Sequence, residues 1–328
     1  MNHVRWGIIG CGDVTEVKSG PGFQKSEQSS LVAVMRRDGE LAADYASRHH
    51  VPKWYADADQ LINDPEVDAV YIATPPAYHK EYTIKCAQAG KPAYVEKPMA
   101  LNTAECLEMI QACDEARVPL FVAFYRRTLP KFLKIKELLD SGVIGDVRYV
   151  TVRNSTPPIK VSANNELPWR VIPELSGGGL FIDLGSHTLD ILDFLLGPIQ
   201  HASGHIGNQA GLYEAEDIVS ASFVFESGIQ GSGLWCFTAF EHVDLTEIIG
   251  SKGKLSFSTF GKEPIVWSSV SGCVEYPFET PEHVQQPLIQ TIVSELLGTG
   301  ICPSHGESAA RTSLVMDQIM GVTKVTIK

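Results

Sequence analysis

The chain has 328 residues, of which 44% are apolar and 20% charged, so it is long enough for two globular domains with cores of their own. Its net charge of -12 and pI near 5.3 argue against a nucleic acid or an anionic membrane as partner, because either would be approached against electrostatic repulsion.

The seven cysteines are scattered and form none of the Cys-x-x-Cys pairs that thiolate zinc sites and redox motifs need. We therefore predict no metal site and expect buried thiols in a reducing compartment. The first predicted strand begins by Val4, which leaves no room for a signal peptide, and no apolar run approaches the length that spans a bilayer. The cytoplasm is the expected location.

Residues 4–9 are largely apolar and run directly into Gly10-x-Gly12. A strand that ends in such a glycine pair turns tightly and lets amide N–H groups approach a pyrophosphate, while the next helix adds its positive dipole. Thr15 stands where the third glycine of the dinucleotide fingerprint belongs, and that glycine serves helix packing rather than the phosphate contact. The cofactor-binding residues predicted here are Gly10, Cys11, Gly12, Asp13 and Val14.

A second predicted strand, residues 31–35, ends at two arginines about twenty residues after the glycines, where an adenosine ribose would lie. Guanidinium groups at Arg36 and Arg37 suit a 2′-phosphate, so we predict a preference for NADP(H) over NAD(H). Two alternatives remain: Asp38 serves the ribose if the strand ends two residues later, or the arginines are a solvated strand end.

Further strands are predicted at residues 67–73 and 93–95, with helices between them, which is the pattern of a doubly wound parallel sheet. The second of these strands ends at Glu96-Lys97-Pro98, and ligands of such sheets bind at the carboxyl edge. Taken alone, a Glu-Lys pair at a strand end is usually a solvated ion pair.

A last strand of the first domain is predicted at residues 120–123, after a helix at residues 103–116 with Thr103 as its N-cap. Tyr125, Arg126 and Arg127 follow this strand. They suit an anionic or polyhydroxyl ligand and suit interdomain ion pairs equally well. The predicted domains are residues 1–123, which bind the dinucleotide, and residues 124–328, which bind substrate and form the oligomer.

Residues 154–176 contain four prolines and little periodicity, which predicts a long loop. Trp169 and Arg170 within it suit a cover for a sugar or a nicotinamide, although a tryptophan that only packs the loop down is the alternative. Three glycines, residues 177–179, then precede Asp183, His187 and Asp190.

The i, i+4, i+7 spacing of these three polar residues places them on one stripe of a helix, and the glycines permit close backbone approach. A catalytic role is favoured over a surface pair. The rest of the chain predicts β-hairpins at residues 218–237 and 243–259 and two closing helices. A broad antiparallel face is a ready dimer surface, so we expect a homodimer or homotetramer through this sheet.

Several motifs together resemble one family. They are Gly10-Cys11-Gly12, Ala73-Thr74-Pro75-Pro76 with His79, the stretch 89–98 ending in Glu96-Lys97-Pro98, and Gly-Gly-Gly-x-x-x-Asp-x-x-x-His. This combination is similar to the Gfo/Idh/MocA family, named for glucose-fructose oxidoreductase, inositol dehydrogenase and rhizopine catabolism, over nearly the whole chain.

The resemblance implies an α/β fold, with an N-terminal Rossmann doubly wound parallel sheet and a C-terminal α+β domain that has a large, mainly antiparallel sheet. It implies NAD(P)-dependent oxidation or reduction of a carbohydrate-like alcohol or carbonyl. It also extends the predicted cofactor-binding residues to Thr74, Pro75, His79, Glu96 and Lys97.

The expected reaction is hydride transfer between nicotinamide C4 and a secondary alcohol carbon of a sugar, polyol or cyclic diol. Neutral His187 would take the hydroxyl proton, Lys97 would stabilise the developing charge on the oxygen, and Asp183 would orient the substrate or His187. Glu96 either holds Lys97 or has a structural role. The predicted substrate-binding residues are Tyr125, Arg126, Trp169, Arg170 and Asp183.

Two other classes remain open. A nucleotide-binding regulator or sugar sensor of this fold would lack part of the Lys, Asp and His set, which is complete here. A glycosidase with tightly bound NAD would oxidise its substrate only transiently. The residues do not identify the substrate or the physiological direction of the reaction.

Overall fold

The structure is a computed structural model that describes residues 2–159 and 166–322. The described chain divides into two compact units, one made of residues 2–129 and 281–310, the other of residues 130–280 and 311–322. They differ from the predicted domains 1–123 and 124–328, because residues 281–310 return to the first unit. None of the described helices is both long and apolar enough to span a bilayer.

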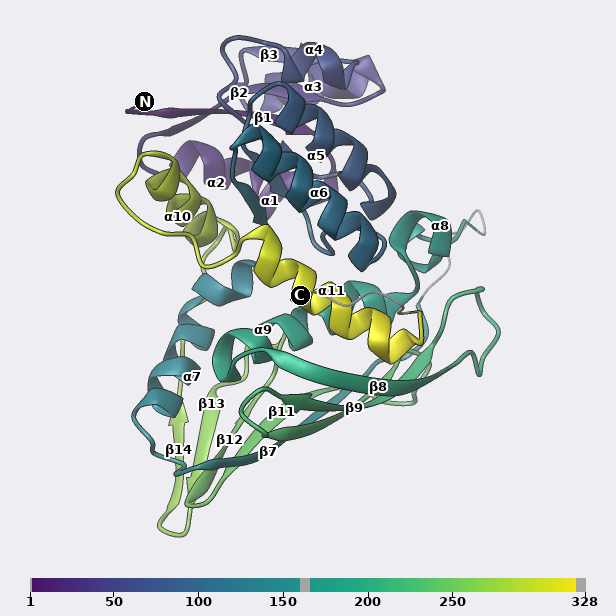
Figure 1. The fold of residues 1–328 in the computed structure, drawn as a ribbon, viewed down its shortest axis with the longest axis vertical. Helices are drawn as coiled ribbons and strands as arrows, with labels where there is room; N and C mark the ends of the chain where they lie inside the picture. Colours follow the sequence, from purple (N-terminus) through teal and green to yellow (C-terminus); the bar gives the residue numbers. More distant parts are fainter. Residues whose placement is uncertain (1, 160–165, 323–328) are drawn as a thin grey trace. The chain divides into compact units, whose positions relative to one another are not determined.

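The first unit is built on a six-stranded parallel sheet (Figure 1), which confirms the predicted Rossmann-type arrangement. The strand order is β3-β2-β1-β4-β5-β6, and it reverses direction between β1 and β4, where ligands of such sheets bind. The bounds are β1 Val4–Ile9, β2 Ser29–Met35, β3 Lys53–Tyr55, β4 Ala69–Ile72, β5 Ala93–Val95 and β6 Leu120–Val122.

Helices connect these strands and cover the sheet. Three of them begin at side-chain caps, in which Asp38, Asp57 and Asn102 accept hydrogen bonds from backbone N–H groups of the first turn. The predicted cap Thr103 was wrong by one residue, since Asn102 caps that helix. The bounds are α1 Asp13–Val17, α2 Gly20–Lys25, α3 Gly39–Arg48, α4 Ala58–Ile62, η1 Pro76–Tyr78, α5 His79–Gln88, α6 Thr103–Ala116, η2 Tyr125–Thr128 and α10 Gln286–Leu296.

The core of this unit explains why residues 281–310 belong to it. Trp6, Phe23, Tyr71 and Tyr94 are fully buried, with ring centroids 4.8–6.4 Å apart. The apolar face of α10 joins the same cluster and loses all contact with water there, which favours its burial in this unit. The core residues from α10 are Leu288, Ile289, Ile292 and Val293.

The second unit contains an eight-stranded sheet in which every pair is antiparallel except β7 with β10, so the predicted mainly antiparallel sheet is confirmed. The strand order is β14-β13-β12-β11-β7-β10-β9-β8. The bounds are β7 Val147–Ser155, β8 Ile199–Gly207, β9 Ile218–Phe225, β10 Gln230–Cys236, β11 Val243–Gly250, β12 Gly253–Phe257, β13 Ile265–Ser269 and β14 Gly272–Tyr276.

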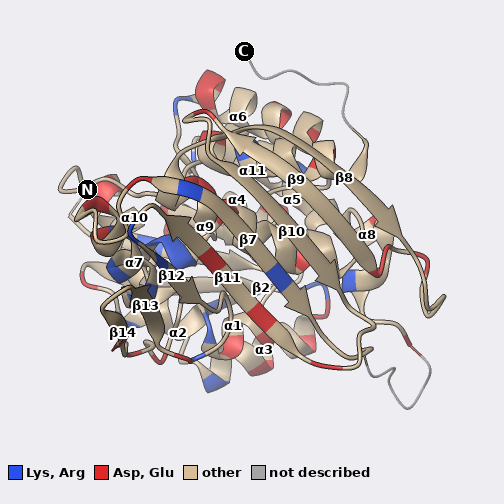
Figure 2. Cartoon of the chain, turned by 90° about the horizontal axis from the view of Figure 1, so that it is seen from below, with Lys and Arg blue, Asp and Glu red and all other residues tan. Residues whose placement is uncertain are grey.

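One face of this sheet packs against helices, and buried and exposed residues alternate along β9 accordingly. Charged residues of both signs occur along the strands of this sheet (Figure 2). The helical segments are α7 Pro130–Asp140, η3 Trp169–Val171, α8 Pro173–Ser176, η4 Phe181–Gly185 and α9 Ser186–Leu196, while α11 Gly306–Met320 begins in the first unit and ends in the second. Part of the predicted loop 154–176, residues 160–165, lies outside the described residues.

All seven cysteines are free thiols, and five of them are buried, as expected. Burial raises the pKa of the Cys11 thiol to about 11 and that of Cys113 to about 12, so both are neutral small hydrophobes at ordinary pH. The described residues hold no group of three or more His, Cys, Asp or Glu side chains arranged for a metal ion.

Candidate active site

The glycine turn lies at the carboxyl end of β1. Gly10 has a φ of +89°, and a Cβ there would lie 2.9 Å from Thr74 Cγ2, so both the backbone conformation and the close approach of β4 require glycine. At Gly12 the nearest atom to an added Cβ is 3.9 Å away, and α1 begins at the next residue. The turn is therefore packed beneath Gly10 and open beside Gly12, where a phosphate approaches in such folds.

Thr15, in the place of the third fingerprint glycine, closes the turn itself. Its hydroxyl accepts a hydrogen bond from the Gly12 N–H (3.0 Å) and donates to the Gly12 carbonyl (2.8 Å). The Tyr45 hydroxyl donates to the Thr15 carbonyl at 2.8 Å, and Gly20 provides the close approach, since its Cβ would lie 2.2 Å from that oxygen. The third glycine of the fingerprint is thus replaced by two features. The Thr15 hydroxyl closes the turn, and Gly20 permits the close packing.

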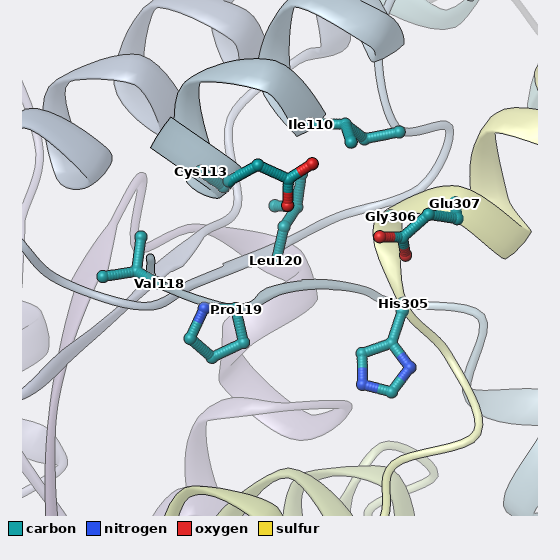
Figure 3. A pocket seen from close by; sticks show the side chains of 9 residues that line it. Ile110, Cys113, Val118, Pro119, Leu120, His305, Gly306 and Glu307 are labelled. Atoms are coloured by element: carbon teal, nitrogen blue, oxygen red, sulfur yellow. The ribbon is translucent and has the colours of Figure 1, made fainter. Parts of the chain in front are cut away.

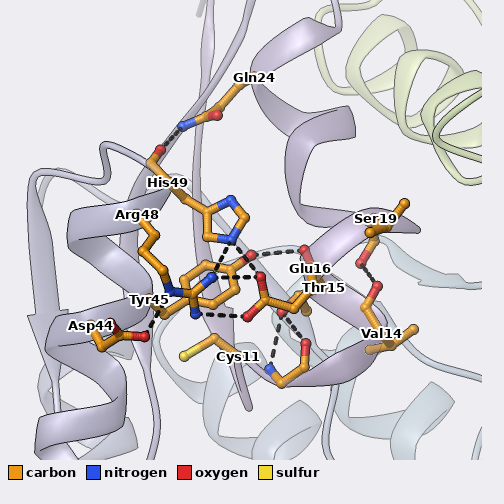
Figure 4. Close-up of polar contacts among 12 residues, drawn as sticks. Cys11, Val14, Thr15, Glu16, Ser19, Gln24, Asp44, Tyr45, Arg48 and His49 are labelled. Carbon is orange, nitrogen blue, oxygen red and sulfur yellow. Dashed lines mark hydrogen bonds and ion pairs between the residues drawn. The ribbon is translucent and has the colours of Figure 1, made fainter.

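An ionic cluster ties α1 to α3 (Figure 4). Arg48 donates two hydrogen bonds of 2.8 Å to the Glu16 carboxylate, and His49 Nε2 lies 2.8 Å from the same group. The paired Arg48 guanidinium lowers the pKa of the Glu16 carboxyl to about 2. The His49 ring stacks on Tyr45 with 4.1 Å between centroids. Sequence reasoning missed this cluster, because its members are about 30 residues apart.

Three polar residues follow β2, and the surroundings of the two arginines differ from those of Asp38. The strand ends at Met35, so Arg36 is the first residue beyond it, and its Nη1 lies 3.4 Å from the Cys11 carbonyl of the glycine turn. The Arg37 guanidinium lies 5.4 Å from the centroid of the Tyr78 ring. Asp38 is the N-cap of α3, and its Oδ1 accepts hydrogen bonds from two N–H groups of the first turn at 3.1 and 3.2 Å. This oxygen of the Asp38 carboxylate is therefore engaged by the helix.

Thr74, Pro75 and His79 follow β4. The Thr74 hydroxyl is buried and has no hydrogen-bond partner within the described part of the chain. His79 is fully buried, with Nε2 2.8 Å from the Thr74 carbonyl and Nδ1 3.1 Å from the Pro98 carbonyl. Burial lowers the pKa of the His79 imidazole. This ring joins the end of β4 to the segment after β5.

Glu96 and Lys97 follow β5, at the same edge of the sheet. The Glu96 carboxylate is buried and accepts hydrogen bonds from the Tyr71 hydroxyl, the Gln285 amide and the Lys97 backbone N–H. Lys97 is half-buried, and the peptide bond between Lys97 and Pro98 is cis. Sequence reasoning did not find Gln285, which is 189 residues from Glu96 and lies in no recognisable motif.

Tyr125, Arg126 and Arg127 are buried where β6 ends. The Arg126 guanidinium lies 5.0 Å from the centroid of the Tyr125 ring. Arg127 donates to the Pro303 carbonyl at 2.8 Å and to Ser308 Oγ at 3.1 Å, which holds the later segment of this unit against β6. Arg127 therefore has a supporting role within the first unit, and the choice between ligand and ion-pair roles stays open for Tyr125 and Arg126.

In the second unit, the glycines at 177–179 permit the close backbone approach that their sequence predicts. The group that approaches them is the side chain of Glu216, which belongs to the same unit. A Cβ on Gly179 would lie 3.0 Å from Glu216 Oε1, and the Gly179 N–H donates to that oxygen at 2.9 Å. A Cβ on Gly178 would collide with Ile182. Burial raises the pKa of the Glu216 carboxyl. Glu216 thus anchors the start of the helical segment that carries Asp183.

That segment is not a single regular helix. Residues Phe181–Gly185 form a π-helical turn before α9, so Asp183 and His187 do not follow the regular α-helical stripe that their spacing predicts. Gly185 permits the tight turn, because a Cβ there would lie 2.6 Å from the Phe181 ring. Turns of this kind are frequent at functional sites.

The structure brings Trp169, Arg170 and Asp183 together. Arg170 Nε lies 3.1 Å from Asp183 Oδ2, and its guanidinium lies 4.6 Å from the centroid of the Trp169 ring. His187 is buried, with its ring 5.8 Å from that of Phe260. Asp190 accepts a hydrogen bond from Thr312 at 3.4 Å.

The predicted residues thus form two groups. Lys97 and the predicted cofactor-binding residues belong to the first unit, and Asp183 and His187 to the second. A surface pocket of the first unit contains none of them (Figure 3). It lies at the other end of β6 and is lined by Ile110, Cys113, Asp114, Val118, Pro119, Leu120, His305, Gly306 and Glu307.

Comparison with known proteins extends this description. Residues 4–124 match the model of an oxidoreductase family with an NAD-binding Rossmann fold, and residues 132–256 match the GFO/IDH/MocA C-terminal domain. The chain is 42% identical to oxidoreductase P35 of Formosa agariphila, over 98% of this chain and 99% of that protein. It is 31% identical to trans-1,2-dihydrobenzene-1,2-diol dehydrogenase of Mus musculus, over 76% and 73% of the two chains.

Solved structures have the same fold. Levoglucosan dehydrogenase, in complex with NADH and levoglucosan, superposes with a TM-score of 0.85 over 98% of this chain and 97% of that chain, at 21% identity.

Proposed function

Because the chain belongs to the Gfo/Idh/MocA family of NAD(P)-binding oxidoreductases, we propose that it transfers a hydride between a nicotinamide cofactor and a secondary alcohol or carbonyl of a sugar, polyol or cyclic diol. One observation carries the proposal: the glycine turn after β1 and Lys97 after β5 stand at the same edge of one parallel sheet. The names of two relatives, a dihydrodiol dehydrogenase and a levoglucosan dehydrogenase, support the substrate class.

The residues at this edge fit a dinucleotide. The space beside Gly12 and the buried Thr74 hydroxyl are features that a bound phosphate or ribose would use. The residues that would hold the cofactor are Gly10, Cys11, Gly12, Asp13, Val14, Arg36, Arg37, Thr74, Pro75, Glu96 and Lys97, with His79 joining two of their segments. When bound, the nicotinamide supplies the acceptor or donor of the hydride.

The chain's own residues would handle the oxygen and its proton. Lys97 would donate a hydrogen bond to the reacting oxygen and stabilise its developing negative charge. His187 would accept the hydroxyl proton in the direction of oxidation. Asp183, held by Arg170, would orient the substrate, and Trp169 would cover it. Tyr125 and Arg126 are further candidates for substrate contact.

A preference for NADP(H) is part of the proposal. Arg36 faces the glycine turn, Arg37 lies over Tyr78, and both side chains are exposed. Asp38, the alternative ribose ligand, is engaged as the cap of α3, which supports the arginines as the ribose-side residues.

The function is tested by incubating the protein with NADP+ or NAD+ and a panel of sugars, inositols and dihydrodiols, and following the absorbance of reduced nicotinamide. A substrate-dependent rise is the expected result. Cofactor that stays bound through desalting, with cleavage of a glycoside and no net absorbance change, would favour the glycosidase alternative. Sugar binding without any turnover would favour a sensor.

We also propose a homodimer or homotetramer through the uncovered face of the eight-stranded sheet. Apolar side chains are exposed there, among them Tyr149 on β7 and Leu234 on β10. The cytoplasm is the location that we propose for the enzyme.

A further inference from the structure

A buried carboxylate with neutral hydrogen-bond donors lies directly before Lys97 in the chain. Glu96 is 7% exposed, and its Oε1 accepts hydrogen bonds of 2.5 Å from both the Tyr71 hydroxyl and Gln285 Nε2. Its Oε2 accepts the backbone N–H of Lys97 at 3.1 Å. Each of these donors is neutral, so the carboxylate depends on hydrogen-bond geometry for its stability in the core.

The hydrogen-bonding properties of a carboxylate fix the orientation of the Gln285 amide. A carboxylate only accepts hydrogen bonds, so the NH2 group of Gln285 has to face Glu96. The amide oxygen then accepts from the Tyr94 hydroxyl at 2.7 Å. Tyr71 and Tyr94 stack on each other with 4.8 Å between centroids and are fully buried, so neither hydroxyl is free to move.

The segment around Gln285 also contacts the end of α1, the helix that follows the glycine turn. The Gln285 backbone N–H donates to the carbonyl of Lys18, the C-cap residue of α1, at 3.1 Å. Two residues earlier, His283 Nδ1 lies 2.7 Å from the Val17 carbonyl. Gln285 is the N-cap residue of α10, yet its side chain does not cap that helix. Its amide is committed to the Glu96 carboxylate instead.

We propose that Gln285 is a positioning residue of the active site. Its amide fixes the Glu96 carboxylate, and the hydrogen bond that the Lys97 N–H donates to Glu96 fixes the strand end that carries Lys97. The inference rests on the proposed role of Lys97. Without a donor from Gln285, the carboxylate gains by turning toward water, and the Lys97 bond is lost with it. Small displacements of a reacting group are costly to catalysis.

The test is the substitution Gln285→Glu, which keeps the shape and replaces the donor by a second carboxyl group. At high pH both groups are ionised and repel each other, whereas at lower pH one shared proton restores a donor to Glu96. We expect kcat to be at least about 10-fold below wild type at pH 8–9 and to recover toward wild type below about pH 6. The KM for substrate and the Kd for cofactor stay within about threefold.

The matched control is Gln286→Glu, the same change one residue later. Among the residues that the structure describes, the Gln286 amide donates to the Lys25 carbonyl, at 3.3 Å, and is not one of the hydrogen-bond donors to Glu96. The ratio of its kcat to that of wild type is expected to be constant across pH. A second variant, Tyr71→Phe, removes the other donor to Oε1 without adding charge, and we expect kcat to fall about 3- to 10-fold at every pH with KM unchanged.

Three results would overturn the proposal: a Gln285→Glu profile parallel to that of wild type, a loss of kcat equal to the loss of folded protein measured by circular dichroism, or a Tyr71→Phe enzyme with normal kcat. A Lys97→Met enzyme that keeps its turnover would instead remove the proposed chemistry. The two failures are therefore distinguishable.

Discussion

At the scale of single residues, the setting of Lys97 comes from its neighbours in the fold. Strand β5 ends at Val95 and is followed by the buried Glu96. The half-buried Lys97 comes next, and His79 contacts the carbonyl of the residue after it, Pro98. A charge held in this way is preorganised, since its surroundings need not rearrange during the reaction.

Replacing Lys97 by methionine removes this charge and keeps most of the side-chain length. We expect turnover to fall roughly 10²- to 10³-fold, with cofactor affinity within a few-fold of wild type. Steady-state kinetics and a cofactor titration measure the two quantities. Lys136 on α7, which is also half-buried and pairs with Asp140, provides the control substitution Lys136→Met. A Lys97→Met enzyme with most of its activity would remove Lys97 from the mechanism.

His187 is buried one turn after Asp183, on the segment anchored by Glu216. For His187→Asn we expect the rate to fall about 10²- to 10⁴-fold and the rise of alcohol oxidation on the basic side to disappear, because the proton acceptor is lost. The measurement is the pH dependence of kcat/KM in the direction of oxidation, with His201→Asn on the exposed strand β8 as control. An unchanged profile would show that the proton leaves by another route.

Cofactor choice depends on Arg36 and Arg37. We expect the wild type to bind NADPH about tenfold or more tightly than NADH, because one charge-assisted contact contributes about 1.5–3 kcal/mol. The double variant Arg36→Ala, Arg37→Ala is expected to lose this preference. Titrating both reduced cofactors by nicotinamide fluorescence measures it. Equal binding by the wild type, or a double variant that still prefers NADPH, would contradict the assignment.

At the scale of elements, α1 has five residues, too few to be stable alone. Its neighbours hold it: Tyr45 bonds the Thr15 carbonyl, and Arg48 and His49 bind Glu16 (Figure 4). The helix that would face a cofactor phosphate is thus oriented by α3, the helix that follows β2.

This ion pair predicts a pH-dependent stability. The pKa of Glu16 in the folded protein, about 2, is below the ordinary value of 4.5 for a glutamate, so its ionised form stabilises the fold above pH 4.5, and this contribution is lost as the pH falls through about 2. The substitution Arg48→Met removes the partner of Glu16 and with it this contribution to stability. We expect the variant to unfold at a lower temperature than wild type at pH 6–7. This difference in melting temperature, the gap between the two proteins, is expected to disappear between pH 4.5 and 2.

Thermal unfolding followed by circular dichroism at several pH values measures this gap. Arg148→Met is the control, since Arg148 is exposed and lies 3.4 Å from Asp146. A gap that persists at pH 2 would assign the effect to the packing of Arg48 on the Tyr45 ring instead.

At the scale of the whole molecule, each unit carries a different part of the proposed chemistry. Residues 281–310 complete the core of the first unit through α10 and supply Gln285 to the Glu96 site. The second unit offers a broad sheet with exposed apolar residues, and charged residues of both signs occur along its strands (Figure 2). Its proposed role in assembly is open to a direct test.

Leu234 lies on the uncovered face of this sheet and is 44% exposed. We expect the wild type to have the mass of a dimer or tetramer in light scattering coupled to size exclusion, and Leu234→Arg to shift it to the monomer, because a buried unpaired charge opposes association. Leu133→Arg, on an exposed position of α7, is the matched control and keeps the wild-type mass. A monomeric wild type would contradict the proposed assembly.

Much of the fold follows from local patterns. Alternating apolar strands and helices, the glycine turn after β1 and the proline that ends β5 are signals between residues close in sequence, and they predicted the parallel sheet and the edge that carries Lys97. These signals depend on periodicity and on backbone preferences, which each short segment has by itself.

Other features were decided only by tertiary packing. Tyr45 meets Thr15, Glu216 meets the glycines before Asp183, and Gln285 meets Glu96 across 189 residues of chain. The same packing assigns Asp38 to a helix cap and places Asp183 in a π-helical turn before α9. No local pattern encodes these contacts, because a buried hydrogen bond between distant residues exists only after the elements that carry them have packed.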